Sequence, residues 1–141
     1  MHNLGMVLAI AQTNKIRMQL ILLFLLGLPV NQTLNTKEIK TALSIGSAKE
    51  LVKFCNATVE IKINDESSNY STNQAEAILK KFFDENPPTS FDYIHQGSTD
   101  ENIAYTIGRY VSSTSKTFRV VTFIKQSGSK YLIDTLNFSE E

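Results

Sequence analysis

The sequence of 141 residues contains one cysteine, Cys55, two histidines, six glycines and no tryptophan. A single cysteine excludes an intrachain disulfide, so a small domain of this kind must depend on its apolar core. We expect no metal site, because His95 and Cys55 have no second histidine or cysteine at a ligand spacing. The glycines are isolated, so the chain offers no phosphate-binding loop and we expect no cofactor.

An excess of charge of either sign is also lacking. The 14 Lys and Arg residues balance 14 Asp and Glu residues, which gives a formal net charge of zero. The basic residues are scattered, and Lys80-Lys81 is their densest pair. Nucleic-acid binding requires clustered basic side chains that neutralise phosphates, so we exclude a nucleic-acid partner.

The N-terminal region carries one conspicuous apolar run, Leu20–Val30, which follows Lys15 and Arg17. A positive flank followed by about 7–15 apolar residues is typical of a secretory signal peptide. The run is too short for a transmembrane helix, which needs roughly 20 apolar residues. We therefore interpret residues 1–33 as a leader for export. No cleavage site of the A-x-A kind follows, so an uncleaved leader that anchors the protein to a membrane stays an alternative.

Residues 34–141 are expected to form a single domain that begins with helices. Thr36 is predicted to cap the first helix and Gly46 to end it. A capping box from Ser47 to Glu50 opens the second helix, whose apolar stripe extends to Cys55. Cys55 is therefore interpreted as an inert core thiol at a helix end rather than as a nucleophile.

The third helix is the most clearly marked. The capping box Ser71-Thr-Asn-Gln74 begins it, and Pro87-Pro88 ends it. Its apolar stripe consists of Ala75, Ile78, Leu79, Phe82 and Phe83. We expect a sheet to curl around this helix and to bury both phenylalanines.

The rest of the domain is predicted to form strands. Val59–Ile63 alternates apolar and polar residues between the second and third helices. Four further runs follow the double proline: Ser90–Gly97, Asn102–Val111, Thr117–Lys125 and Lys130–Phe138. Their short connectors are typical of antiparallel hairpins. The pattern predicts an α+β fold, in which N-terminal helices and one long helix pack on a curved antiparallel sheet.

Two segments carry a family resemblance: FFDENPPTSFDYIHQGS, residues 82–98, and FRVVTFIKQSGSKYLIDTLNF, residues 118–138. With the order of elements, they resemble a bacterial domain of unknown function in the nuclear-transport-factor-2-like superfamily of cone-shaped, cystatin-like α+β domains. The resemblance covers Thr36 to Glu141. It implies a small exported protein of Gram-negative bacteria, periplasmic or secreted, with a curved sheet that encloses a pocket. It supplies no catalytic motif, since the superfamily contains enzymes, ligand binders and interaction modules.

His95 is the only histidine outside the leader and the only side chain suited to acid–base chemistry near neutral pH. On Ser90–Gly97 it is expected to share a face with Phe91 and Tyr93. It could then act as a general base oriented by Tyr105 or Asp134. The alternative, which we favour, is a strand-end histidine bonded to backbone or solvent.

Asp134 interrupts an apolar face of the last strand, so its carboxylate requires a partner. Arg109 or Arg119 is the expected partner, in a structural ion pair rather than in an anion-binding site. The candidate pocket residues are Phe83, Tyr93, His95, Tyr105, Arg109 and Asp134.

Three hypotheses follow for function. The leading one is an exported, non-enzymatic module that binds a small apolar ligand or a protein partner, including a second copy, through the curved-sheet pocket. The second is a small dehydratase- or isomerase-like enzyme, which requires His95 inside an enclosed cavity. The third is a structural homodimer with an empty interior.

Overall fold

The computed structural model describes residues 34–99 and 101–141. The described residues belong to one compact unit. The predicted leader, residues 1–33, lies outside the described residues. Among the described residues, no helix has the length and apolar character needed to cross a bilayer.

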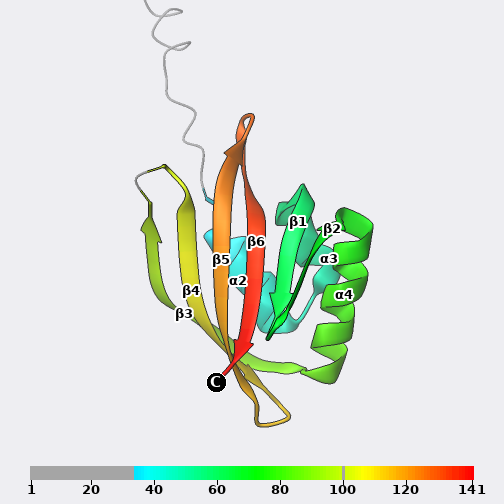
Figure 1. The fold of residues 1–141 in the computed structure, drawn as a ribbon. Coiled ribbons are helices and arrows are strands. Elements are labelled where there is room, and N and C mark those ends of the chain that lie inside the picture. Colours follow the sequence, from blue (N-terminus) through cyan, green and yellow to red (C-terminus); the bar gives the residue numbers. More distant parts are fainter. Residues whose placement is uncertain (1–33, 100) are drawn as a thin grey trace, which may run out of the picture. The chain divides into compact units, whose positions relative to one another are not determined.

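Helices and one six-stranded sheet build the domain (Figure 1). The elements in chain order are α2 (Thr36–Ile45), α3 (Ala48–Leu51), η1 (Val52–Phe54), β1 (Cys55–Ile63), β2 (Glu66–Ser71), α4 (Thr72–Glu85), β3 (Pro88–Ser98), β4 (Ala104–Ser112), β5 (Thr117–Ser127) and β6 (Lys130–Glu140). The strand order is β2-β1-β6-β5-β4-β3. The predicted α+β class, with helices on a curved sheet, is confirmed.

The sheet is mixed rather than wholly antiparallel. Strands β3 to β6 form the expected antiparallel meander, but β1 pairs with β6 in parallel. Between β1 and β6 the chain runs through β2, α4 and the strands β3 to β5, and such a long connection permits a parallel pair. The hairpin partner of β1, strand β2, was not predicted, because ESSNYS contains only one large apolar side chain.

The ends of the helices agree with the predictions except at two positions. Ser71 and Gln74 form the predicted capping box of α4. Gly46 ends α2 in the left-handed conformation, with a φ of 65°. Thr36 is the first helical residue and not the cap, which is Asn35. Cys55 is the first residue of β1 and does not end a helix, since the chain turns through η1 just before it.

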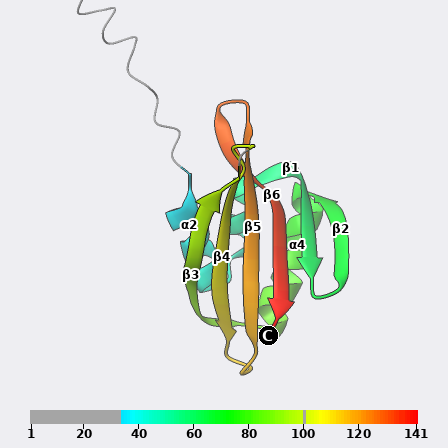
Figure 2. The same cartoon turned by 60° about the vertical axis from the view of Figure 1, so that its left-hand side comes forward.

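The helices α2, α3 and α4 lie on one side of the sheet, which we call the inner face, and the opposite side is the outer face (Figures 1 and 2). Phe82 and Phe83 of α4 are 3% and 4% exposed, as predicted. The ring centroid of Phe82 lies 5.6 Å from that of Tyr110, 5.0 Å from Phe118 and 4.3 Å from Phe138. The sheet therefore holds α4 through an aromatic cluster.

Small side chains on β4 permit this packing. Its buried residues are Ala104, Thr106, Gly108, Tyr110 and Ser112. The ring of Phe91 lies against Gly108 on the inner face, where a Cβ would be 2.3 Å from Phe91 Cζ. The more apolar-looking face of β4 points outward, so hydrophobicity alone assigns this strand to the wrong side.

Candidate functional site

A β-bulge separates His95 from the residues expected beside it. Tyr93 pairs with Gly108, but His95 pairs with Ile107, so one extra residue lies between them on β3. An extra residue moves the following side chains to the other face of a strand. The prediction that His95 shares a face with Phe91 and Tyr93 is therefore wrong.

His95 is exposed to solvent on the outer face. Its Nε2 atom lies 3.0 Å from the hydroxyl oxygen of Tyr105, one of its predicted partners. Arg109 is also exposed, and pairs across the strands with Arg119. The structure thus brings His95 and Tyr105 together, but without an enclosing cavity.

Asp134 forms a structural ion pair, as predicted, but with a different partner. Its carboxylate lies 2.7 Å from Lys125 Nζ, and not against Arg109 or Arg119. The register between β5 and β6 shifts between Phe123 and Ile124, which places Asp134 at the irregularity. The Asp134 side chain therefore pairs with Lys125 on the neighbouring strand β5 instead of with an arginine.

Phe83 and Tyr93 lie on the inner face and serve the core. Phe83 is buried in the aromatic cluster. The Tyr93 hydroxyl donates a hydrogen bond of 2.6 Å to the backbone oxygen of Thr36, which ties β3 to α2. Burial raises the pKa of Tyr93 to about 12, because the charged phenolate is poorly solvated there. The six predicted pocket residues therefore do not converge on one site.

Cys55 is a buried thiol whose Sγ lies 3.7 Å from the backbone oxygen of Leu51. Burial raises its pKa from 9.0 to about 12, and a neutral thiol is a poor nucleophile. The predicted core environment of Cys55 is confirmed, although its strand position was not expected.

We expect Cys55 to resist an aromatic disulfide reagent at pH 8 in the native protein and to react within the dead time after unfolding in denaturant. Absorbance of the released thiolate measures both rates. Because the folded pKa lies above the unfolded one, the contribution of Cys55 to stability is complete below pH 9 and is lost as pH rises toward 12. Equal rates for the native and unfolded protein would contradict the burial.

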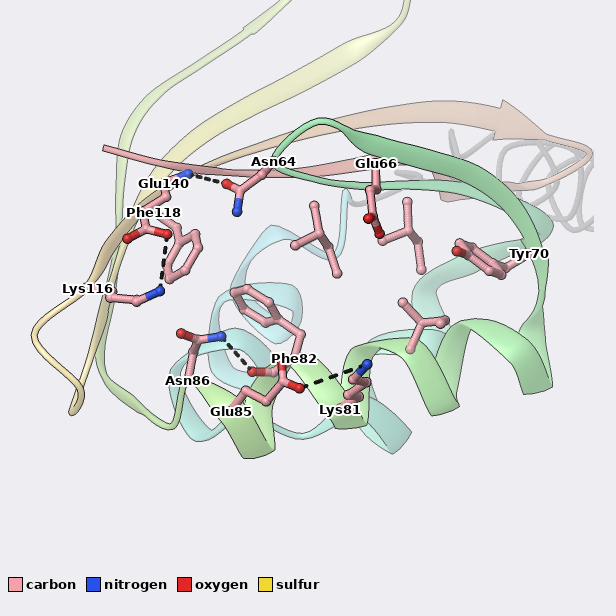
Figure 3. A pocket seen from close by; sticks show the side chains of 13 residues that line it. Asn64, Glu66, Tyr70, Lys81, Phe82, Glu85, Asn86, Lys116, Phe118 and Glu140 are labelled. Atoms are coloured by element: carbon pink, nitrogen blue, oxygen red, sulfur yellow. Dashed lines mark hydrogen bonds and ion pairs between the residues drawn. The ribbon is translucent and has the colours of Figure 1, made fainter.

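A cleft of about 270 Å³ opens between α4 and the β1–β2 hairpin (Figure 3). Apolar side chains from three elements, β1, α4 and β5, line it: Ile61, Ile63, Ile78, Phe82 and Phe118. Polar side chains complete the lining: Asn64, Glu66, Tyr70, Lys81, Glu85, Asn86, Lys116 and Glu140. None of the six predicted pocket residues is among them.

Hydrogen bonds fix the C-terminal end of α4 and the turn of the hairpin beside this cleft. The buried amide of Asn86 donates to the backbone oxygen of Phe82 over 3.2 Å, and the Tyr110 hydroxyl donates to the backbone oxygen of Asn86. At the hairpin turn, Asn64 Oδ1 accepts a 2.9 Å bond from the backbone of Glu140. The walls are therefore held by the fold itself rather than by a ligand.

The sequence contained a signal for this cleft that hydrophobic periodicity missed. Asn64 lies in the turn with a φ of 54°, a conformation that asparagine tolerates. A short polar strand after such a turn would pair with β1 and place Glu66 opposite Ile63. This strand leads directly into α4. Recognising the Asn-Asp turn would have revealed the hairpin.

Helices packed on one side of a curved sheet are typical of the cystatin-like, nuclear-transport-factor-2-like α+β fold. Structures of that kind are similar to this one: a cystatin-like domain of unknown function from Nostoc punctiforme has a TM-score of 0.59 at 12% identity, over 75% of this chain and 72% of that chain. A de novo designed protein with a curved β-sheet has a TM-score of 0.60 at 12% identity, over 74% and 94%. At such identities the likeness concerns the fold alone.

The chain belongs to the DUF4783 family, a domain of unknown function whose family model matches residues 36–139. A DUF4783 protein from Bacteroides ovatus is 30% identical, with a TM-score of 0.69, over 74% of this chain and 93% of that chain. One from Bacteroides uniformis is 27% identical with the same TM-score, over 74% and 95%. No curated protein matches the chain. The resemblance found in the sequence is confirmed at the level of family and fold.

Proposed function

We propose that this domain is an exported, non-enzymatic module that binds a small, largely apolar ligand in the cleft between α4 and the β1–β2 hairpin. The observation that carries the proposal is the cleft itself, a preformed concavity with an apolar floor and a polar rim. Ligand sites are commonly built in this way, with volumes that start near 300 Å³. With a volume of about 270 Å³, the cleft suits a small ligand of about a dozen carbon atoms or fewer.

The proposal of export rests on the leader pattern, Lys15 and Arg17 followed by Leu20–Val30. The similar structures come from Bacteroides, which are Gram-negative bacteria, and in such a cell this leader would direct the domain to the periplasm or beyond. A small domain without a disulfide remains suited to that compartment, because its aromatic core supplies the stability.

The alternative of an enzyme that uses His95 lacks its main requirement. A general base works within reach of a bound substrate, in a site that excludes bulk water. His95 is exposed on the outer face and does not line the cleft. The position of His95 therefore does not support the dehydratase or isomerase hypothesis.

The substitution Ile78→Arg tests the proposal. Ile78 is half-buried at the cleft, and the longer, charged arginine side chain would occupy the space in which the ligand is proposed to lie. We expect the affinity for 1-octanol, measured by isothermal titration calorimetry, to fall at least about tenfold, since tenfold corresponds to only about 1.4 kcal/mol.

Ile94→Arg is the matched control, because Ile94 is 63% exposed on β3 and lies outside the cleft. This variant should bind 1-octanol like the wild type, and both variants should retain the wild-type circular dichroism spectrum. Wild-type affinity in folded Ile78→Arg would refute the cleft as the binding site.

The outer face of the sheet supports a second candidate, the docking of another copy of this chain. Tyr105 pairs with Phe123 across the strands, and Ile107 pairs with Val121. Phe123 is 36% exposed, and no helix of the described residues covers this side (Figure 2). An uncovered apolar centre on a sheet face is a feature of interaction surfaces.

A further inference from the structure

The negative and positive side chains around the cleft are not equal in number. Three glutamates and two lysines line it, so one negative charge is left over when they are counted together. Glutamate and lysine side chains are both charged at neutral pH. A cleft with an apolar floor and a surplus negative charge has a defined preference among small ligands.

Four of the five charged side chains are engaged with one another. Lys116 Nζ lies 3.3 Å from a carboxylate oxygen of Glu140, and Lys81 Nζ lies 4.0 Å from one of Glu85 (Figure 3). Among the residues that the structure describes, Glu66 has no ion-pair partner. The surplus charge is therefore located on one residue, Glu66.

The strand pairing directs Glu66 toward the cleft. Glu66 lies directly opposite Ile63, and Tyr70 lies directly opposite Val59. Directly opposed residues of an antiparallel pair point to the same face. Because Val59 is buried on the inner face, Glu66 also belongs to that face, and Figure 3 shows its carboxylate below the hairpin, beside the apolar side chains.

We infer that the ligand of this cleft is a small amphipathic cation, with an ammonium group that pairs with Glu66 and an apolar tail that lies on the floor. This inference rests on the proposed function and adds the charge of the ligand. A carboxylate or sulfate would meet the surplus charge of Glu66, while both lysines are already paired. An ammonium group would neutralise that charge and complete the ion pairs of the rim.

Three probes with the same eight-carbon tail test the inference in the full chain at pH 7 and low salt: octylammonium, 1-octanol and octanoate. We expect octylammonium to bind about tenfold more tightly than 1-octanol in calorimetry, and octanoate to bind more weakly than both. The substitution Glu66→Gln should remove the preference for octylammonium over 1-octanol. Glu66 is exposed, so the variant should fold normally, which its thermal unfolding midpoint verifies.

Glu60→Gln is the matched control. Glu60 lies on the same hairpin, but it accepts a 2.7 Å hydrogen bond from Ser67 and does not line the cleft. This variant should keep the full preference for octylammonium. Binding of 1-octanol with no preference for the cation, or a preference that survives Glu66→Gln, would overturn this inference and leave the proposed function standing. Failure of all three probes to bind would overturn both.

Discussion

Replacement of Phe82 by alanine is expected to lower the free energy of unfolding by about 3–5 kcal/mol. Phe82 is 3% exposed, and its ring contacts those of Tyr110, Phe118 and Phe138, which come from three different strands. Truncation would remove these contacts and leave a cavity between α4 and the sheet. Because a whole domain is stabilised by only about 5–15 kcal/mol, the loss would be a large fraction of the total. Urea denaturation followed by far-ultraviolet circular dichroism measures it.

Phe123→Ala is the matched control for this experiment. It removes the same atoms from a phenylalanine that is 36% exposed on the outer face. Its cost should stay below about 2 kcal/mol, since much of the ring is already in water. Similar losses for the two variants would mean that α4 is not the centre of the core.

Gly108→Ala is expected to destabilise the protein by about 2–3 kcal/mol, although alanine is normally better tolerated in a strand than glycine is. A Cβ at this position would lie 2.3 Å from Cζ and 2.4 Å from Cε2 of Phe91, and 3.1 Å from the backbone oxygen of Asp92. Phe91 is itself 3% exposed and has no room to move. The shift of the thermal unfolding midpoint measures the effect.

Two comparisons make this prediction specific. Gly97→Ala also creates a close contact, but with the hydroxyl end of Tyr105, which can move toward solvent, so its cost should stay within about 1 kcal/mol. The double variant Phe91→Leu with Gly108→Ala should be more stable than the sum of the two single effects predicts, by at least about 1 kcal/mol. Strict additivity would show that Phe91 does not lie against Gly108.

The sequence was sufficient to predict the elements that depend on local patterns. The capping box at Ser71, the left-handed stop at Gly46 and the apolar stripe of α4 are each encoded within a few residues. The four-strand meander follows from alternation and short connectors. These features determine the fold class, and they are the parts that the structure confirms.

The positions of the predicted pocket residues could not be derived in the same way, because they depend on irregularities of the sheet. The bulge between Tyr93 and His95 reverses the face of every later residue on β3, and no composition signal marks it. The shift between Phe123 and Ile124 likewise redirects Asp134 toward Lys125. The parallel pairing of β1 with β6 is a long-range event that local periodicity does not encode.

The binding of a ligand in the cleft is tested most directly by NMR. Backbone amide chemical shifts of the full chain, labelled with ¹⁵N, are followed as 1-octanol is added. If the ligand binds in the cleft, the largest shifts will fall on Ile63, Tyr70 and Lys81, and the signals of Ile107 and Phe123 on the outer face will not change. Shifts confined to Ile107 and Phe123, with the cleft residues unaffected, would contradict binding in the cleft and favour the outer face as the binding surface.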